Sequence, residues 1–173
     1  MNRPTAFPMT AIALLCLAVT FPASNAVAQQ KSLKDQLIGT WTLVSNDDTE
    51  RNGSKHQYYS ANPRGILILD AGGQYAQVTG RPDRPKFKAT DNIRLDTPAA
   101  QYGEAARAFA GNFGTWSINE ADKTLTRRYE AALIPNVEGT DRKEAVSLTG
   151  NEMKLVYTSA AGLKTEAVYR RAR

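Results

Sequence analysis

The feature that most restricts the fold of this chain is a series of short strand-like segments that turn residues separate at even intervals. The predicted strands are 40–45, 55–59, 65–69, 74–79, 112–119, 123–133, 142–149, 152–158 and 163–171. Pairs such as Asn52-Gly53 and Gly150-Asn151 lie between them and are typical of tight hairpins. Because nearly all the strands follow in hairpin order, the pattern predicts an all-β fold, an up-and-down antiparallel barrel of about eight to nine strands, rather than a sandwich.

Two short helices interrupt this pattern. Ser32, with Asp35 three residues later, is typical of a capped helix start, and Gly39 ends that helix within two turns. A longer helix is predicted over 98–110, with Thr97 as its cap and Gly111 just past its end. Its apolar stripe comprises Tyr102, Ala105, Ala106 and Phe109. We expect this helix to lie over an opening or an edge of the sheet.

The first 28 residues have the pattern of a signal peptide. They carry one charge, Arg3, then an apolar run over 11–19, then Ala26-Val27-Ala28. The run is too short to span a membrane, which takes about 20 apolar residues. Removing 28 of 173 residues leaves 145, enough for one barrel domain over 29–173. The only cysteine, Cys16, leaves with the signal, and we expect an exported protein, periplasmic or secreted.

The charge pattern argues against a nucleic-acid partner. Without Arg3 the net charge falls from +5 to +4, and acidic residues are interspersed among the basic ones. The densest basic segment is 81–88, which we interpret as a solvated rim or as a positive mouth that attracts an anionic headgroup. We expect neither nucleic-acid binding nor stable membrane insertion.

Residue types that carry common catalysis are scarce. His56 is the only histidine, and it lies in a polar hairpin segment, so we expect no metal site and no cofactor. The chain has no Gly-x-Ser-x-Gly elbow, which disfavours hydrolase chemistry. We name no catalytic residue.

Several motifs resemble a known family. Gly39-Thr40-Trp41 opens the first predicted strand after a short helix, as the Gly-x-Trp of lipocalins does, and Arg171 is placed like the arginine that covers that tryptophan. Over 37–171 the chain is similar to bacterial lipocalin-like domain proteins. The similar segments are 37–45, Pro63-Arg64-Gly65-Ile66-Leu67, Gly73-Gln74-Tyr75, 81–87, Phe113-Gly114-Thr115-Trp116, Leu133-Ile134-Pro135-Asn136, Gly139-Thr140 and 148–155. The resemblance implies a calycin-type barrel closed at one end by Gly39, Trp41 and Arg171.

The chain departs from the family pattern at charged positions. Arg127-Arg128-Tyr129-Glu130 stands where these proteins often carry paired histidines, Glu144 where an arginine is usual, and Tyr169 where a tryptophan is usual. We predict that Arg128 and Glu144 face the same side of the sheet and compensate each other's charge.

The resemblance and the seven tyrosines together favour a binding role. We predict a small hydrophobic or amphipathic ligand in the barrel interior, bound by Tyr75, Arg81, Tyr102, Phe109, Phe113, Arg128 and Tyr129. Arg128 and Tyr129 are neighbours on one strand and face opposite sides, so at least one of them must be wrong. Two alternatives stay open: an isomerase or cyclase that uses the same cavity, and an interaction module with a filled barrel. An interior cavity larger than about 300 Å³ would favour ligand binding or catalysis over the module.

Overall fold

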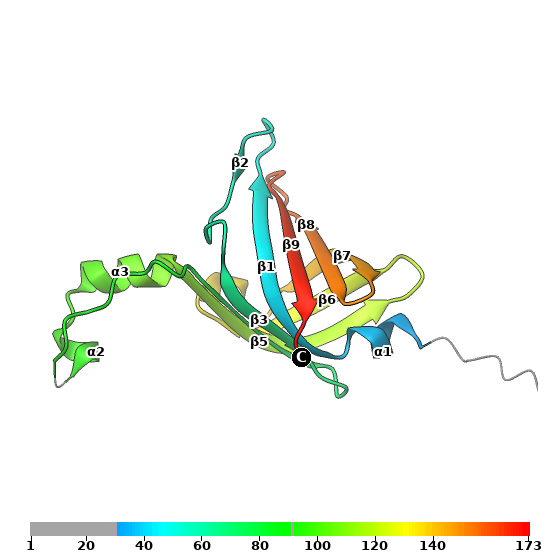
Figure 1. The fold of residues 1–173 in the computed structure, drawn as a ribbon, viewed down its shortest axis with the longest axis horizontal. Coiled ribbons are helices and arrows are strands. Elements are labelled where there is room, and N and C mark those ends of the chain that lie inside the picture. The colour runs from blue at the N-terminus through cyan, green and yellow to red at the C-terminus, as the bar shows by residue number, and fades with distance from the viewer. Residues whose placement is uncertain (1–30, 91) are drawn as a thin grey trace, which may run out of the picture. The chain divides into compact units, whose positions relative to one another are not determined.

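The computed structural model describes residues 31–90 and 92–173, and it shows a closed antiparallel barrel of eight strands with one extra strand (Figure 1). The strands are β1 (Gly39–Thr49), β2 (Lys55–His56), β3 (Arg64–Leu69), β4 (Gln74–Gly80), β5 (Phe109–Asn119), β6 (Thr124–Ala132), β7 (Asp141–Thr149), β8 (Glu152–Thr158) and β9 (Lys164–Arg171). The helices are α1 (Leu33–Leu37), α2 (Ile93–Asp96), α3 (Ala99–Arg107) and the 3-10 turn η1 (Pro135–Val137). The predicted fold class is confirmed. The predicted signal peptide, 1–28, lies outside the described residues.

The barrel closes through β1. From β3 to β9 each strand pairs with the next, and β1 pairs with β3 on one side and with β9 on the other. The extra strand β2 meets only the end of β1, at Asp48 and Thr49, so the predicted strand 55–59 is reduced to two residues. No helix among the described residues is long and apolar enough to cross a membrane.

One end of the barrel is closed by α1. The side-chain oxygen of Ser32 accepts the Asp35 amide at 3.0 Å, the predicted cap. Trp41 is fully buried, and its indole Nε1 donates to the Leu37 carbonyl at 2.8 Å. The Arg171 guanidinium lies 4.2 Å from the centre of the Trp41 ring and donates to the Ile38 carbonyl at 3.0 Å and to the Gln36 carbonyl. The expected stacking of arginine on tryptophan is therefore present.

Gly39 is required at this closure. Its φ is +135°, a conformation that L side chains rarely adopt, and a Cβ there would lie 2.9 Å from Arg171 Nη1. The interior behind the closure is a packed apolar core. Its buried members are Leu37, Trp41, Leu43, Leu67, Leu69, Tyr75, Trp116, Leu125, Val146, Met153, Leu155, Ala167 and Tyr169.

Strand β1 is longer than predicted. The segment 46–54 has the composition of a polar turn, yet β1 continues to Thr49 and pairs with β9 along the way. The register shifts between Leu43 and Ser45, and after this bulge Asn46 and Asp48 line the barrel interior. Polar residues are tolerated on the inner face there because that part of the interior is a cavity.

The helix predicted over 98–110 is shorter. It forms as Ala99–Arg107, with Pro98 rather than Thr97 at the cap position. The residues from Phe109 onward join β5, because Phe109 pairs with Gly80 and extends the ladder between β4 and β5. Phe109 therefore reaches the interior from a strand, while Tyr102 remains on the helix.

Candidate ligand-binding pocket

A cavity of about 640 Å³ occupies the end of the barrel opposite α1. Its walls come from the last residues of β1, β4 and β6 and the first residues of β5, β7 and β9, which meet at that end. Residues of α3 and of the segment before η1 border it as well. The cavity is several hundred Å³ in volume, the range usual for small-molecule sites.

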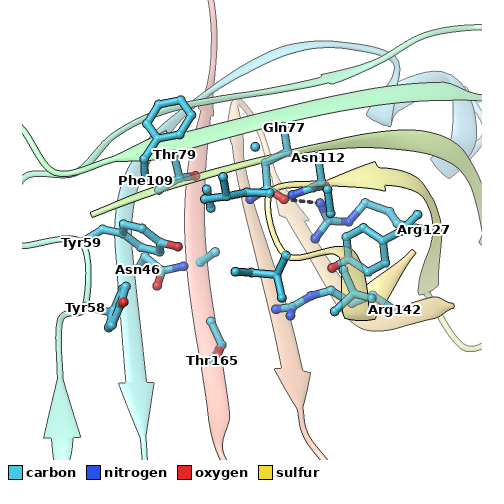
Figure 2. A pocket seen from close by; sticks show the side chains of 18 of the residues that line it. Asn46, Tyr58, Tyr59, Gln77, Thr79, Phe109, Asn112, Arg127, Arg142 and Thr165 are labelled. Carbon is cyan, nitrogen blue, oxygen red and sulfur yellow. Dashed lines mark hydrogen bonds between the residues drawn. The ribbon is translucent and has the colours of Figure 1, made fainter. Parts of the chain in front are cut away.

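The wall combines aromatic and aliphatic surface with a few polar groups. Tyr58, Tyr59 and Phe109 lie on one side in Figure 2, and Arg127 and Arg142 on the other. The wall also carries amide and hydroxyl side chains, among them Asn46, Gln77, Thr79, Asn112 and Thr165. Such a surface holds an apolar body and orients it by a small number of hydrogen bonds.

At the inner end of the cavity, five side chains from four strands form a connected polar cluster. Its members are Gln77, Arg127, Arg142, Glu144 and Tyr169. Arg127 Nε and Nη2 lie 2.8 and 2.7 Å from Glu144 Oε2. Arg142 Nε donates to the other carboxylate oxygen at 2.9 Å. Arg127 Nη1 donates to Gln77 Oε1, and Gln77 Nε2 donates to the Tyr169 hydroxyl at 3.0 Å.

Burial shapes the ionisation of this cluster. Arg127 and Glu144 are only 2% and 3% exposed. Burial would raise the pKa of the Glu144 carboxyl, but the charges of Arg127 and Arg142 outweigh it and hold the pKa below its usual value. Burial would likewise lower the Arg127 pKa, but Glu144 outweighs it and the pKa is raised. The pair therefore stays ionised inside the barrel.

The neighbouring phenols stay neutral. Burial raises the pKa of Tyr169 to about 12, and burial also raises the pKa of Tyr75 to about 12. The Tyr75 hydroxyl is buried without a hydrogen-bond partner in the described part of the chain, and so is Asn112 Oδ1, which lines the cavity. Asn112 Oδ1 is thus a buried acceptor beside the cavity with unused hydrogen-bonding capacity.

Of the seven predicted ligand-binding residues, the structure brings two to the cavity. Phe109 and Tyr129 line it. Tyr75 is buried next to it, where its ring lies 6.5 Å from that of Tyr129 and 5.2 Å from the Arg127 guanidinium, measured between centres. Tyr75 therefore supports Arg127 from the core.

The other four predicted residues lie elsewhere. Arg81 pairs with Asp83 on the surface, at 2.8 Å. The Tyr102 hydroxyl donates to the Ile93 carbonyl and so ties α3 to α2. Phe113 is 50% exposed on the outer face of β5. Arg128 is exposed, and Nη1 lies 3.2 Å from Asp141.

The predicted partnership of Arg128 with Glu144 is wrong. On β6, Leu125 is fully buried and Arg127 shares its face, so Arg128 points outward. Glu144 is opposite Leu125 on β7 and pairs with Arg127 instead. The buried ion pair exists, one residue away from the predicted one.

The sequence analysis did not predict the polar cluster, although it marked three of its members, Arg127, Glu144 and Tyr169, as departures from the family pattern. The alternation of side chains along β6 does not by itself show which of its two faces points into the barrel. Leu125 carried the missing signal, because it is the one large aliphatic residue of β6 and large aliphatic residues favour the core. No comparable signal marked Gln77, Asn46 or Thr165. Among the described residues no cluster of three or more His, Cys, Asp or Glu side chains forms a candidate metal site.

The chain is similar to several solved structures. A redesigned β-barrel is 14% identical, with a TM-score of 0.42, and the match covers 83% of this chain and 100% of that one. The REP1-NXSQ fatty acid transporter is 11% identical, with a TM-score of 0.39 and coverage of 80% and 98%. A variant of the fluorescent protein UnaG is 11% identical, with a TM-score of 0.36 and coverage of 80% and 97%.

No curated protein matches the chain in sequence. The family model for the lipocalin-like domain matches residues 38–172, which contain all the strands from β1 to β9. The resemblance seen in the motifs is thereby confirmed, and the chain belongs to the lipocalin-like domain family.

Proposed function

We propose that this protein binds a small, mostly apolar molecule in the open end of its barrel. The observation that carries the proposal is the cavity of about 640 Å³, walled by aromatic side chains and floored by the polar cluster. A cavity of this size and surface stabilises an apolar molecule by removing it from water, while the polar groups select its orientation. The export expected from residues 1–28 is part of the same proposal and is tested by the N-terminal residue of protein recovered outside the cytoplasm, expected to be Gln29.

The open cavity supports binding over an interaction module with a filled barrel. Binding is also favoured over an isomerase or cyclase by the ionisation of the cavity groups. Tyr169 and Glu144 have pKa values shifted away from neutrality, upward and downward respectively. A general acid or base works best with a pKa near the operating pH, so these shifts suit fixed hydrogen bonding and charge rather than proton transfer.

Two adjacent alanines provide a matched test. Ala132 lines the cavity, whereas Ala131 pairs with the outward-facing Phe113. We expect wild-type protein to bind Nile red, a neutral apolar dye, with a rise in its fluorescence. Ala132→Trp should fill the cavity and abolish the signal, and Ala131→Trp should retain it, both with native far-ultraviolet circular dichroism.

Native mass spectrometry of protein purified from its natural source provides an independent measurement. The proposal predicts a retained small molecule that Ala132→Trp lacks. Equal dye binding by the two tryptophan variants would contradict a site in the barrel interior.

A further inference from the structure

We propose that the cavity selects a singly charged anionic amphiphile and that Arg142 holds its carboxylate. This inference rests on the proposed function, because it names the class of molecule that the cavity takes. Arg127 and Arg142 share one counterion, Glu144, so the polar cluster carries one uncompensated positive charge.

The two arginines are not equivalent. All three nitrogens of the Arg127 guanidinium are engaged, by Glu144 and Gln77, and its side chain is 2% exposed. Arg142 uses only Nε, toward Glu144, and is 24% exposed. Within residues 31–90 and 92–173, its Nη1 and Nη2 make no hydrogen bond. Arg142 therefore presents two free donors at the cavity wall.

The Arg142 side chain is held in place before a ligand arrives. Its guanidinium lies 3.8 Å from the centre of the Tyr157 ring, and Glu144 fixes its Nε edge. A guanidinium that is fixed at one edge and one face has little freedom to turn, and Figure 2 shows that of Arg142 pointing toward the middle of the pocket. This edge matches the two oxygens of a carboxylate.

Other groups of the wall are compatible with an anion at this place. Asn46 and Tyr59 also line the cavity, and neither side chain makes a hydrogen bond within the described part of the chain. Both can donate to an oxygen. The remaining acidic group, Asp48, accepts the Thr165 hydroxyl at 2.6 Å. Among the lining residues, Arg107, Arg127 and Arg142 outnumber Asp48 and Glu144 by one positive charge. Glu104, which does not line the cavity, pairs with Arg107 at 3.5 Å at the rim, away from the polar cluster.

The test is displacement of Nile red by three molecules with the same alkyl chain: dodecanoate, dodecanol and dodecylammonium. Wild-type protein should bind dodecanoate at least about tenfold more tightly than dodecanol, since a hydrogen bond to a charged group contributes that much. Dodecylammonium should bind most weakly. In Arg142→Met, dodecanoate should fall to the affinity of dodecanol, while dodecanol itself is unchanged. Arg142→Lys should restore part of the preference.

Arg128→Met is the matched control, because Arg128 points outward from the neighbouring strand. It should keep the full preference for dodecanoate. Equal binding of dodecanoate and dodecanol by the wild-type protein would overturn the anion site and leave the proposed function intact, and that comparison needs no variant. A preference that survives in Arg142→Met would overturn the assignment to Arg142. Absence of Nile red binding would contradict the proposed function itself.

Discussion

The two ends of the barrel are built from the same strands and differ in what those strands send inward. Strand β1 contributes Trp41 and Leu43 to the closed end, then Asn46 and Asp48 to the open end. The closed end is filled by side chains and sealed by Arg171. The open end keeps a cavity of about 640 Å³. In β1, β4, β5, β6, β7 and β9, one part of the strand therefore packs into the core and the other part lines the cavity.

The polar cluster lies at the boundary between the two ends. Tyr169 is buried among the core residues and also lines the cavity. Arg127 likewise lies against Tyr75 of the core on one side and lines the cavity on the other. Buried ion pairs add little net stability compared with apolar packing, yet they are costly to break. The cluster therefore acts as a floor that keeps the packed core from extending into the cavity.

The largest expected effect is at the closed end. Trp41→Ala removes a fully buried indole, its hydrogen bond to Leu37 and the surface on which Arg171 stacks. We expect a loss of about 3–5 kcal/mol in the free energy of unfolding, measured by urea denaturation. Val44→Ala, on the outer face of the same strand, should cost less than about 1 kcal/mol. Similar losses of stability for the two variants would contradict the view that the closed-end core is tightly packed while the outer face of β1 tolerates substitution.

The next effect is at the boundary. Glu144→Gln leaves two guanidinium groups without a counterion and should cost about 3 kcal/mol. The double variant Arg127→Met with Glu144→Leu replaces the pair by apolar side chains and should recover most of that loss. If the double variant is as unstable as the single one, the ion pair itself stabilises the fold, beyond preventing an isolated buried charge.

The sequence predicts the closed end far better than the open end. Turn residues and alternation located the strands within a few positions, and Trp41 with Arg171 marked the closure through a recognisable motif. Apolar side chains in a packed core leave such periodic patterns because one face must be buried.

The open end lacks that regularity. The sequence predicts a turn at Asn46 and Asp48 because polar residues normally avoid an interior. In the structure, the bulge after Leu43 changes which residues of β1 face inward, and both side chains line the cavity. Alternation does not tell whether Arg127 or Arg128 points inward. In the structure Arg127 shares its face of β6 with the buried Leu125, so Arg127 is the inward one. Residues that line a cavity do not have to pack against other side chains of the chain, so hydrophobic periodicity cannot locate them.

A pH titration tests whether the Tyr169 hydroxyl, at the boundary between the two ends, is buried. Because burial raises the pKa of Tyr169 to about 12, the folded protein keeps its proton between pH 10 and 12 while the unfolded chain releases it. Stability should therefore fall as the pH rises through this range, by about 1.4 kcal/mol per pH unit for this phenol. Tyr169→Phe should show a slope shallower by that amount. An unchanged slope would show that the Tyr169 hydroxyl is accessible to water.

The smallest effect on stability is expected at the open end. The Asn46 side chain makes no hydrogen bond within the described residues, so Asn46→Ala should change the free energy of unfolding by no more than about 0.5 kcal/mol. The same variant should weaken dodecanoate binding, measured by displacement of Nile red. A large loss of stability would mean that the open end is packed in the free protein.

The most direct test of the division into a structural end and a binding end is a nuclear magnetic resonance titration of ¹⁵N-labelled protein with dodecanoate. Both tryptophans lie in the closed-end core, with indole Nε1 groups bonded to Leu37 and Asp70. The account predicts saturable shifts for the backbone amides of Asn46, Thr79 and Thr165 at the cavity, with the two indole signals unmoved. Shifts centred on the indoles, or no saturable shift at the cavity amides, would contradict it.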